Sequence, residues 1–115
     1  MGNLSTLYER FGGECTFCDR RLVMPPGKRG AKFKLTDQTA TRDHAIPRSR
    51  GGTLAPENTL LACRACNEAK SNMTDLEFRS FLKTGKLPMS YIRYLAERIH
   101  RRVRTYIPHA AKPVE

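Results

Sequence analysis

Four cysteines, grouped as two C-x-x-C pairs, constrain the fold of this chain more than any other feature of its sequence. The pairs are Cys15 with Cys18 and Cys63 with Cys66. Each pair forms a turn whose two thiolates converge on one point, and two such turns complete a tetrahedral zinc shell. Thiolates at all four positions leave no place for a water molecule, so the predicted zinc is structural. A redox-active pair and an iron–sulfur cluster are the alternatives.

The segment between the two pairs, residues 19–62, has room for a functional element, because compact zinc ribbons place only ~15–20 residues there. No secretion signal precedes the cysteines, which argues against a disulfide framework. The 115 residues fit one domain with a thin hydrophobic core, which a bound metal would stabilise.

The charge balance favours a polyanionic partner. Lysine and arginine total 21 against 11 acidic residues, which gives a formal net charge of +10 and an isoelectric point near 10.0. Nucleic acid is the expected partner, and an anionic membrane is the weaker alternative. The sequence contains no run of about 18 apolar residues that could span a bilayer. We therefore expect a soluble, cytoplasmic protein that binds no membrane.

Hydrophobic patterns and turn residues predict a series of short elements in the first two thirds of the chain. They are a helix over 1–11, a basic loop over 25–34, a strand over 39–44, an ordered loop over 45–58 and a strand over 59–62. A helix should then begin near the second cysteine pair and run to about Asn72.

Two further helices are expected after this segment. Thr74 and Glu77 form a capping-box pattern, which predicts a helix that runs to about Lys83. Pro88 suits the first turn of the last helix, and Pro108 should end it.

The segment between the cysteine pairs carries the residues best suited to catalysis. Asp43 and His44 end the first predicted strand and offer a hard oxygen ligand beside an imidazole that is largely neutral at pH 7. Adjacent strand residues point to opposite sides, so one can hold a metal while the other faces a water. Asn67 directly follows Cys66 and offers a second oxygen ligand. Lys70 shares the helix face of Asn67, from which it could meet a phosphate.

These residues belong to an ordered motif that resembles the HNH nucleases, whose ββα-metal core belongs to the His-Me finger group. The motif consists of Asp43-His44, Pro47, Gly51-Gly52, Asn58, Cys63, Cys66-Asn67 and Lys70. It is most similar to the branch that has a four-cysteine zinc site and an asparagine in place of the last histidine. The resemblance covers about half of the chain, from Cys15 to Asn72.

The resemblance implies a role for each motif residue. His44 would be the general base that takes a proton from the attacking water. Asp43 and Asn67 would hold one divalent cation on the scissile phosphate, and their oxygens favour Mg²⁺ or Mn²⁺. Asn58 would form hydrogen bonds within the loop and keep His44 oriented. The expected products carry a 5′-phosphate and a 3′-hydroxyl, and small members of the family often come from phages and mobile elements.

Basic residues in and beyond the motif are candidates for contact with the DNA backbone. They are Lys70, Arg48, Arg50, Arg101 and Arg102. A solvated surface explains Lys70 and the two loop arginines equally well. The last helix also carries an apolar stripe, made of Ile92, Leu95, Ile99 and Val103. We expect this stripe to pack on the domain core, and a dimer seam is the alternative, so the choice between monomer and homodimer stays open.

We therefore expect a small α+β fold, in which a ββα-metal core is stapled by a four-cysteine zinc site and additional helices lie at both ends. A single domain over 1–115 would have its core at about 15–72 and a basic helical extension at about 74–107. The function hypothesis is a metal-dependent DNA endonuclease whose single site nicks one strand. A zinc-stabilised nucleic-acid-binding module without turnover is the first alternative, although it would not need Asp43, His44 and Asn67. RNA binding or cleavage is the second, but no aromatic stacking surface is evident.

Overall fold

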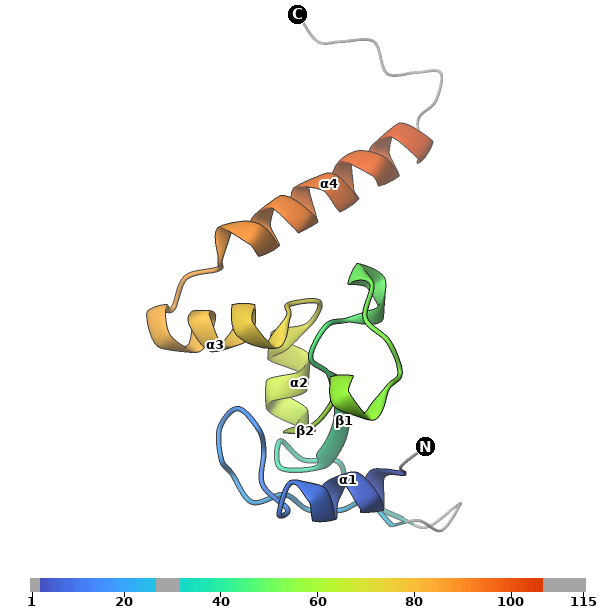
Figure 1. Ribbon diagram of the computed structural model, residues 1–115, viewed down its shortest axis with the longest axis vertical. Coiled ribbons are helices and arrows are strands. Elements are labelled where there is room, and N and C mark those ends of the chain that lie inside the picture. Colours follow the sequence, from blue (N-terminus) through green and yellow to red (C-terminus); the bar gives the residue numbers. More distant parts are fainter. Residues whose placement is uncertain (1–2, 27–31, 107–115) are drawn as a thin grey trace, which may run out of the picture.

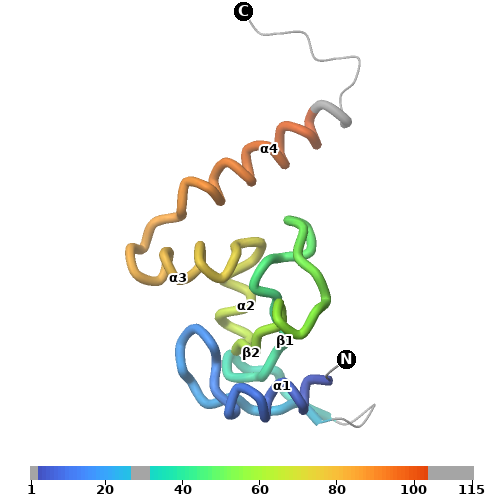
Figure 2. Tube along the Cα trace, viewed as in Figure 1, coloured from blue at the N-terminus to red at the C-terminus, as the bar shows by residue number. Residues whose placement is uncertain are grey.

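The computed structural model describes residues 3–26 and 32–106, of which 104–106 are described by their backbone alone (Figures 1 and 2). Its helices and strands are α1 (Leu4–Arg10), β1 (Ala40–His44), β2 (Thr59–Cys63), α2 (Arg64–Lys70), α3 (Asp75–Thr84) and α4 (Met89–Tyr106). The expected α+β class is confirmed, and the two predicted strands and the helices lie where the sequence patterns put them. The predicted basic loop extends into residues outside the described ranges, and the predicted helix end at Pro108 lies wholly outside them.

β1 and β2 form an antiparallel pair that feeds directly into α2. Ala40 lies opposite Cys63, and His44 lies opposite Thr59. The loop between the strands contains two short 3₁₀ turns, Arg48–Arg50 and Pro56–Asn58. The Cys63 thiol then caps α2 by accepting a hydrogen bond from the backbone N–H of Cys66 at 3.3 Å. The strand pair and α2 thus make the expected ββα unit.

Local capping residues set the ends of the helices. The Asn3 side chain caps α1 by accepting from the backbone N–H of Thr6. The predicted capping box of α3 is present, because the Thr74 and Glu77 side chains each accept from the other residue's backbone N–H. Gly85 ends α3 in the left-handed region, at φ 72°, which a glycine adopts without strain.

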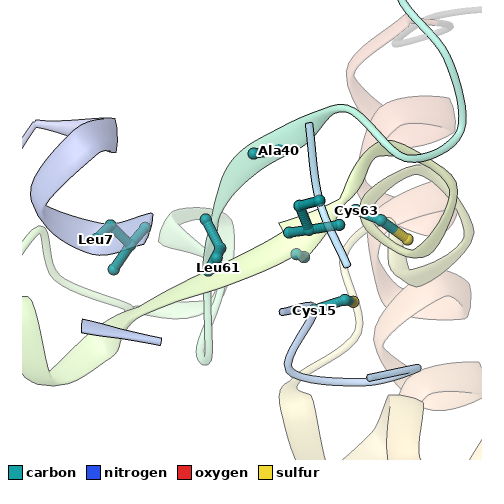
Figure 3. Close-up of a cluster of buried hydrophobic side chains, with 7 residues drawn as sticks. Leu7, Cys15, Ala40, Leu61 and Cys63 are labelled. Carbon is teal, nitrogen blue, oxygen red and sulfur yellow. The ribbon is translucent and has the colours of Figure 1, made fainter. Parts of the chain in front are cut away.

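Two small hydrophobic clusters lie on either side of the first cysteine turn. In the first, Leu7 of α1 and Leu61 of β2 face one another, with Cys15, Ala40 and Cys63 close by (Figure 3). The second is centred on a different set of buried side chains, Met73, Phe78 and Tyr91. Phe17 and Cys66 pack against both clusters, and the ring of Phe17 meets that of Phe78 edge-on at 4.9 Å. The cysteine turns therefore join the sheet to the last two helices.

α4 packs against the second cluster through residues of its first half, and its later turns extend away from the strand pair (Figure 1). Tyr91 is buried, and Tyr94 and Leu95 pack against the second cluster. The other members of the predicted stripe, Ile92, Ile99 and Val103, are 42%, 61% and 49% exposed. The expectation that the whole stripe packs on the core is therefore wrong. The core ends where the helix leaves it, so it covers Leu95 but not the later turns.

Phe78 should be the residue on which the docking of α3 most depends. It is 1% exposed and contacts the rings of Phe17 and Phe81. The substitution Phe78→Ala should lower the free energy of unfolding by about 3–5 kcal/mol, because a buried ring is lost and a cavity remains. Urea unfolding followed by circular dichroism measures the change.

Leu82→Ala on the same helix is the matched control for Phe78→Ala. Leu82 is 50% exposed, so its truncation should change the free energy of unfolding by no more than about 0.5 kcal/mol. Equal effects of the two substitutions would contradict the assignment of Phe78 to the core.

Candidate active site and metal centre

The four cysteines converge as their spacing predicts. All four Sγ atoms lie within 4.8 Å of one another, and those of Cys18 and Cys63 are 3.8 Å apart. Zn–S bonds of ~2.3 Å in a tetrahedron put the sulfurs about 3.8 Å apart, so the cluster has the dimensions of a zinc shell. Cys15 and Cys63 are buried and Cys18 is exposed, which leaves an access path for the ion. The donor set thus fits a structural zinc.

Backbone and thiol chemistry at this cluster also favour a bound cation. The backbone N–H groups of Phe17 and Cys66 donate to Sγ of Cys15 and Cys63, at 3.4 and 3.3 Å. Such bonds stabilise thiolates. Burial and the neighbouring thiols nevertheless raise the pKa of Cys66 far above its ordinary value. Four thiolates cannot share this volume without a positive ion, so zinc binding must displace protons from the cluster.

The end of β1 presents different side chains on its two faces. Thr41 and Asp43 point toward α2, where Thr41 accepts a hydrogen bond from Asn67 and Asp43 pairs with Lys70. Arg42 and His44 line a cavity on the opposite face. The alternation expected for Asp43 and His44 is therefore present, and it separates a buried carboxylate from an imidazole that borders an open space.

Asp43 is held in place from two sides. Its Oδ1 accepts a hydrogen bond from the backbone N–H of His44 at 2.8 Å and another from the Lys70 ammonium at 3.3 Å. The ammonium also lies 3.3 Å from Oδ2, yet this buried oxygen has no hydrogen-bond partner among the described residues. An orphaned carboxylate oxygen of this kind is a suitable ligand for a hard cation.

Lys70 does not lie where a phosphate could reach it. Its side chain is 0% exposed, and the ammonium donates to the backbone carbonyl of His44 at 2.8 Å as well as to Asp43. The expected phosphate contact and the alternative of a solvated surface are both inconsistent with this burial. Lys70 instead ties α2 to the end of β1, because a buried ammonium needs a carboxylate and carbonyl partners. Its sequence position predicted its helix face correctly, but not its depth.

Asn67 projects from the first turns of α2 toward β1. Its side-chain N–H group donates to Oγ1 of Thr41 at 3.0 Å and to the carbonyl of Arg42 at 3.3 Å. These two bonds tie the amide of Asn67 to β1. The amide oxygen of Asn67 and the carboxylate of Asp43 are ligands of the type that Mg²⁺ or Mn²⁺ prefers.

Asn58 closes the loop that follows His44. Its side chain accepts a hydrogen bond from the backbone N–H of Ile46 and donates to the carbonyls of Ile46 and Thr53. Gly52 lies against the same loop, where a Cβ would come within 1.7 Å of the Ile46 carbonyl oxygen. The hydrogen bonds that the resemblance implies for Asn58 are thus present, and they fix the backbone next to His44.

The two arginines of the first 3₁₀ turn have different surroundings. Arg48 is exposed. Arg50 forms a bidentate ion pair with Glu77 and stacks its guanidinium 4.6 Å from the ring centre of Tyr94. Its side chain is only 16% exposed, so its expected contact with the DNA backbone is inconsistent with this position. A tertiary partner from α3, 27 residues later, takes up the charge of Arg50.

Arg101 and Arg102 are exposed on the part of α4 that extends beyond the core. In this respect they match the expected contact with a phosphate backbone. The start of α4 is linked to the loop between the strands through Glu77, which pairs with Arg50 and accepts a hydrogen bond from Ser90.

A cavity of about 260 Å³ borders His44, and the sequence analysis did not identify it. Its lining includes Leu7 and Arg10 of α1, Arg42 of β1 and Leu54 of the loop. Strand alternation could have placed Arg42 beside His44, since the two are two residues apart. The sequence carries no comparable signal for α1, because its approach to the strands depends on tertiary packing.

Removal of the metal from the cysteine cluster should unfold the chain. Structural zinc contributes about 10–16 kcal/mol in small zinc domains, which is comparable to the whole stability of a small protein. We expect one zinc per chain by elemental analysis and loss of the cooperative thermal transition after chelation, with recovery when zinc is added back. A chain that stays folded without metal, or that shows iron–sulfur absorption, would contradict the zinc assignment.

The pH dependence of stability should report the Arg50–Glu77 pair. Burial raises the pKa of Glu77, but hydrogen bonds from Arg50, Ser90 and the Thr74 backbone outweigh it and lower the pKa from 4.5 to about 2. The pair therefore stabilises the fold above pH 4.5, and this contribution is lost as the pH falls toward 2. Glu77→Gln should lower the free energy of unfolding by about 3 kcal/mol near neutral pH.

The difference between wild type and Glu77→Gln should narrow below pH 4.5 in urea titrations with zinc content recorded at each pH. Zinc release in acid affects both proteins equally, so the difference isolates Glu77. A difference that is constant with pH would contradict the ion pair.

Comparison with known proteins agrees with this geometry. A family model described as HNH endonuclease matches residues 32–83, which contain β1, β2, α2, most of α3 and the residues Asp43, His44, Asn58 and Asn67. No curated protein matches the chain. No helix in the described ranges is long and apolar enough to cross a membrane. Over residues 32–83, which are less than half of the chain, the sequence is therefore similar to the HNH endonuclease family, and this similarity implies a nucleic-acid substrate.

Proposed function

We propose that this chain is a metal-dependent DNA endonuclease in which His44 is the general base and Asp43 and Asn67 hold one divalent cation. The observation that carries the proposal is that Asp43 and His44, adjacent at the end of β1, have different surroundings. His44 borders an open cavity on one face, and on the other Asp43 offers a buried oxygen that accepts no hydrogen bond from the described residues. Both residues lie within the segment that the HNH endonuclease family model matches.

His44 is suited to accept a proton from the attacking water. A general base must lie within hydrogen-bond reach of that water in a place that substrate can enter. The half-buried His44 borders such a space, and Asn58 holds the backbone that follows it. As the water oxygen bonds to phosphorus, its proton passes to the imidazole, and the bond from phosphorus to the 3′-oxygen breaks. The products are a 5′-phosphate and a 3′-hydroxyl.

The divalent cation would stabilise negative charge on the phosphate and on the leaving 3′-oxygen. Lys70 sets a condition on its binding. The ammonium already neutralises much of the Asp43 charge, so the protein alone offers a cation little net negative charge. We expect the affinity for Mg²⁺ or Mn²⁺ to increase when a phosphate of the substrate adds its own charge at the site.

The distribution of positive charge supports DNA as the substrate. The chain has a net charge of +10, and Arg48, Arg101 and Arg102 are exposed on the loop and on α4. Contacts of such side chains with phosphates are independent of base sequence and weaken as salt increases. The described residues contain one set of the proposed catalytic side chains, Asp43, His44 and Asn67, so a single binding event would nick one strand.

Conversion of supercoiled plasmid to open circles tests the proposal. Wild type should nick in Mg²⁺ or Mn²⁺, and His44→Ala should nick at least ~100-fold more slowly at equal zinc content, because the general base is lost. Asp43→Asn should also lose activity, since it removes the carboxylate charge. His100→Ala is the matched control, because His100 is an exposed histidine of α4 outside the motif and should leave the rate unchanged.

Equal nicking by wild type and His44→Ala would overturn the general-base role. Binding of DNA by both proteins without cleavage, across metals and DNA forms, would favour a zinc-stabilised binding module instead.

A further inference from the structure

One wall of the cavity beside His44 is built by a segment that the family match does not cover. Leu7 and Arg10 of α1 form one wall, and the family model matches only residues 32–83. Arg42, Leu54 and Pro56 complete the lining around His44. Arg10 also donates a hydrogen bond to the carbonyl of Pro56 at 3.1 Å, so α1 is tied to the loop at the cavity. The N-terminal helix thus adds a feature to the site that the strand pair and α2 lack.

The cavity must lie next to the substrate if His44 is the general base, so the inference rests on the proposed function. The attacking water lies between the imidazole and the scissile phosphate, and the nucleotide attached to that phosphate lies at the cavity mouth. A phosphate group would not enter, because the lining is mainly apolar and burial of a charge there is unfavourable. A nucleobase is a better match, since its faces are apolar and its edges are polar.

The two arginines at the cavity suit the same occupant. Arg10 and Arg42 both line the cavity, and guanidinium groups stack on the faces of bases and also pair with phosphates. Leu54, which is 52% exposed, and Pro56 offer an apolar surface against which a base can pack. A base within an intact duplex cannot use this surface, because its faces are already stacked on its neighbours.

We propose that the cavity receives one unstacked nucleobase next to the scissile phosphate, and that the enzyme therefore prefers DNA that is unpaired at the cleavage position. The cost of unstacking is smallest where the base is already unpaired. A bulge, a single-stranded flap or a branch point would then be a better substrate than an uninterrupted duplex of the same sequence.

Equilibrium binding to matched oligonucleotides tests the inference without cleavage. Three duplexes of one sequence are compared with no divalent cation added: fully paired, with one unpaired nucleotide, and with an abasic unit at the unpaired position. The unpaired nucleotide should bind roughly tenfold more tightly than the abasic unit, because only the former has a base to insert. The abasic duplex keeps the same phosphates and the same interruption of pairing, so the ratio reports chiefly on the base.

Leu54→Asp should bring this ratio close to one, because a carboxylate in the lining disfavours an apolar ring. Leu82→Asp is the matched control, since Leu82 is 50% exposed on α3 and should keep the wild-type ratio. General repulsion of DNA by the new charge weakens both complexes and cancels in the ratio. Nicking rates in Mg²⁺ on the same oligonucleotides should follow the same order.

Equal binding of the base-containing and abasic duplexes would overturn the inference, and sensitivity of both to Leu54→Asp would then assign the cavity to a deoxyribose. Retention of the wild-type ratio by Leu54→Asp would overturn it as well. Absence of nicking on every substrate would count against the proposed function instead. The binding ratio could still be measured in that case, because it does not depend on cleavage. Nicking with no preference for the unpaired nucleotide would leave the endonuclease intact and remove only the cavity's role.

Discussion

The convergence of four thiols at one point links parts of the chain that have little else to hold them together. Cys15 and Cys18 come from the turn that follows α1, and Cys63 and Cys66 lie where β2 passes into α2. Cys15 and Cys63 belong to the first hydrophobic cluster, and Phe17 and Cys66 contact both clusters, so the thiols join the two. Each cluster has few fully buried side chains, and neither would offset the conformational entropy of the chain without an additional constraint.

The two faces of β1 carry different residues of the candidate site. A strand presents successive side chains on opposite sides, and the thiol cluster fixes β2 and α2 on one side of β1. Asp43 therefore meets Lys70 and the neighbourhood of Asn67, while His44 meets α1 and the cavity. Separation of this kind keeps the imidazole away from the Lys70 ammonium and leaves it beside space that a substrate can enter.

Two ion pairs with little exposure to solvent link β1, α2, α3 and the loop between the strands. Lys70 is fully buried and Arg50 is mostly buried, and each has a carboxylate partner from a distant part of the chain, Asp43 and Glu77 respectively. Removal of either carboxylate would leave a buried cation without compensation, which is strongly unfavourable. These pairs connect the end of β1 to α2, and the following loop to α3 and α4. Basic side chains near the motif are thus divided between structural and exposed positions.

The elements that could be predicted from the sequence are those whose physical causes are local. The C-x-x-C turns, the Thr74–Glu77 capping box, the strand alternation at Asp43 and His44, and the run of HNH motif residues all act over a few residues or at an ordered spacing. The burial of Lys70 and Arg50, the exposure of Ile99 and Val103, and the cavity beside His44 that α1 helps to line depend on tertiary packing. Each of these features depends on a contact with a residue that is distant in sequence, or on the extent of the hydrophobic core. A local sequence pattern encodes neither the contact nor the extent of the core.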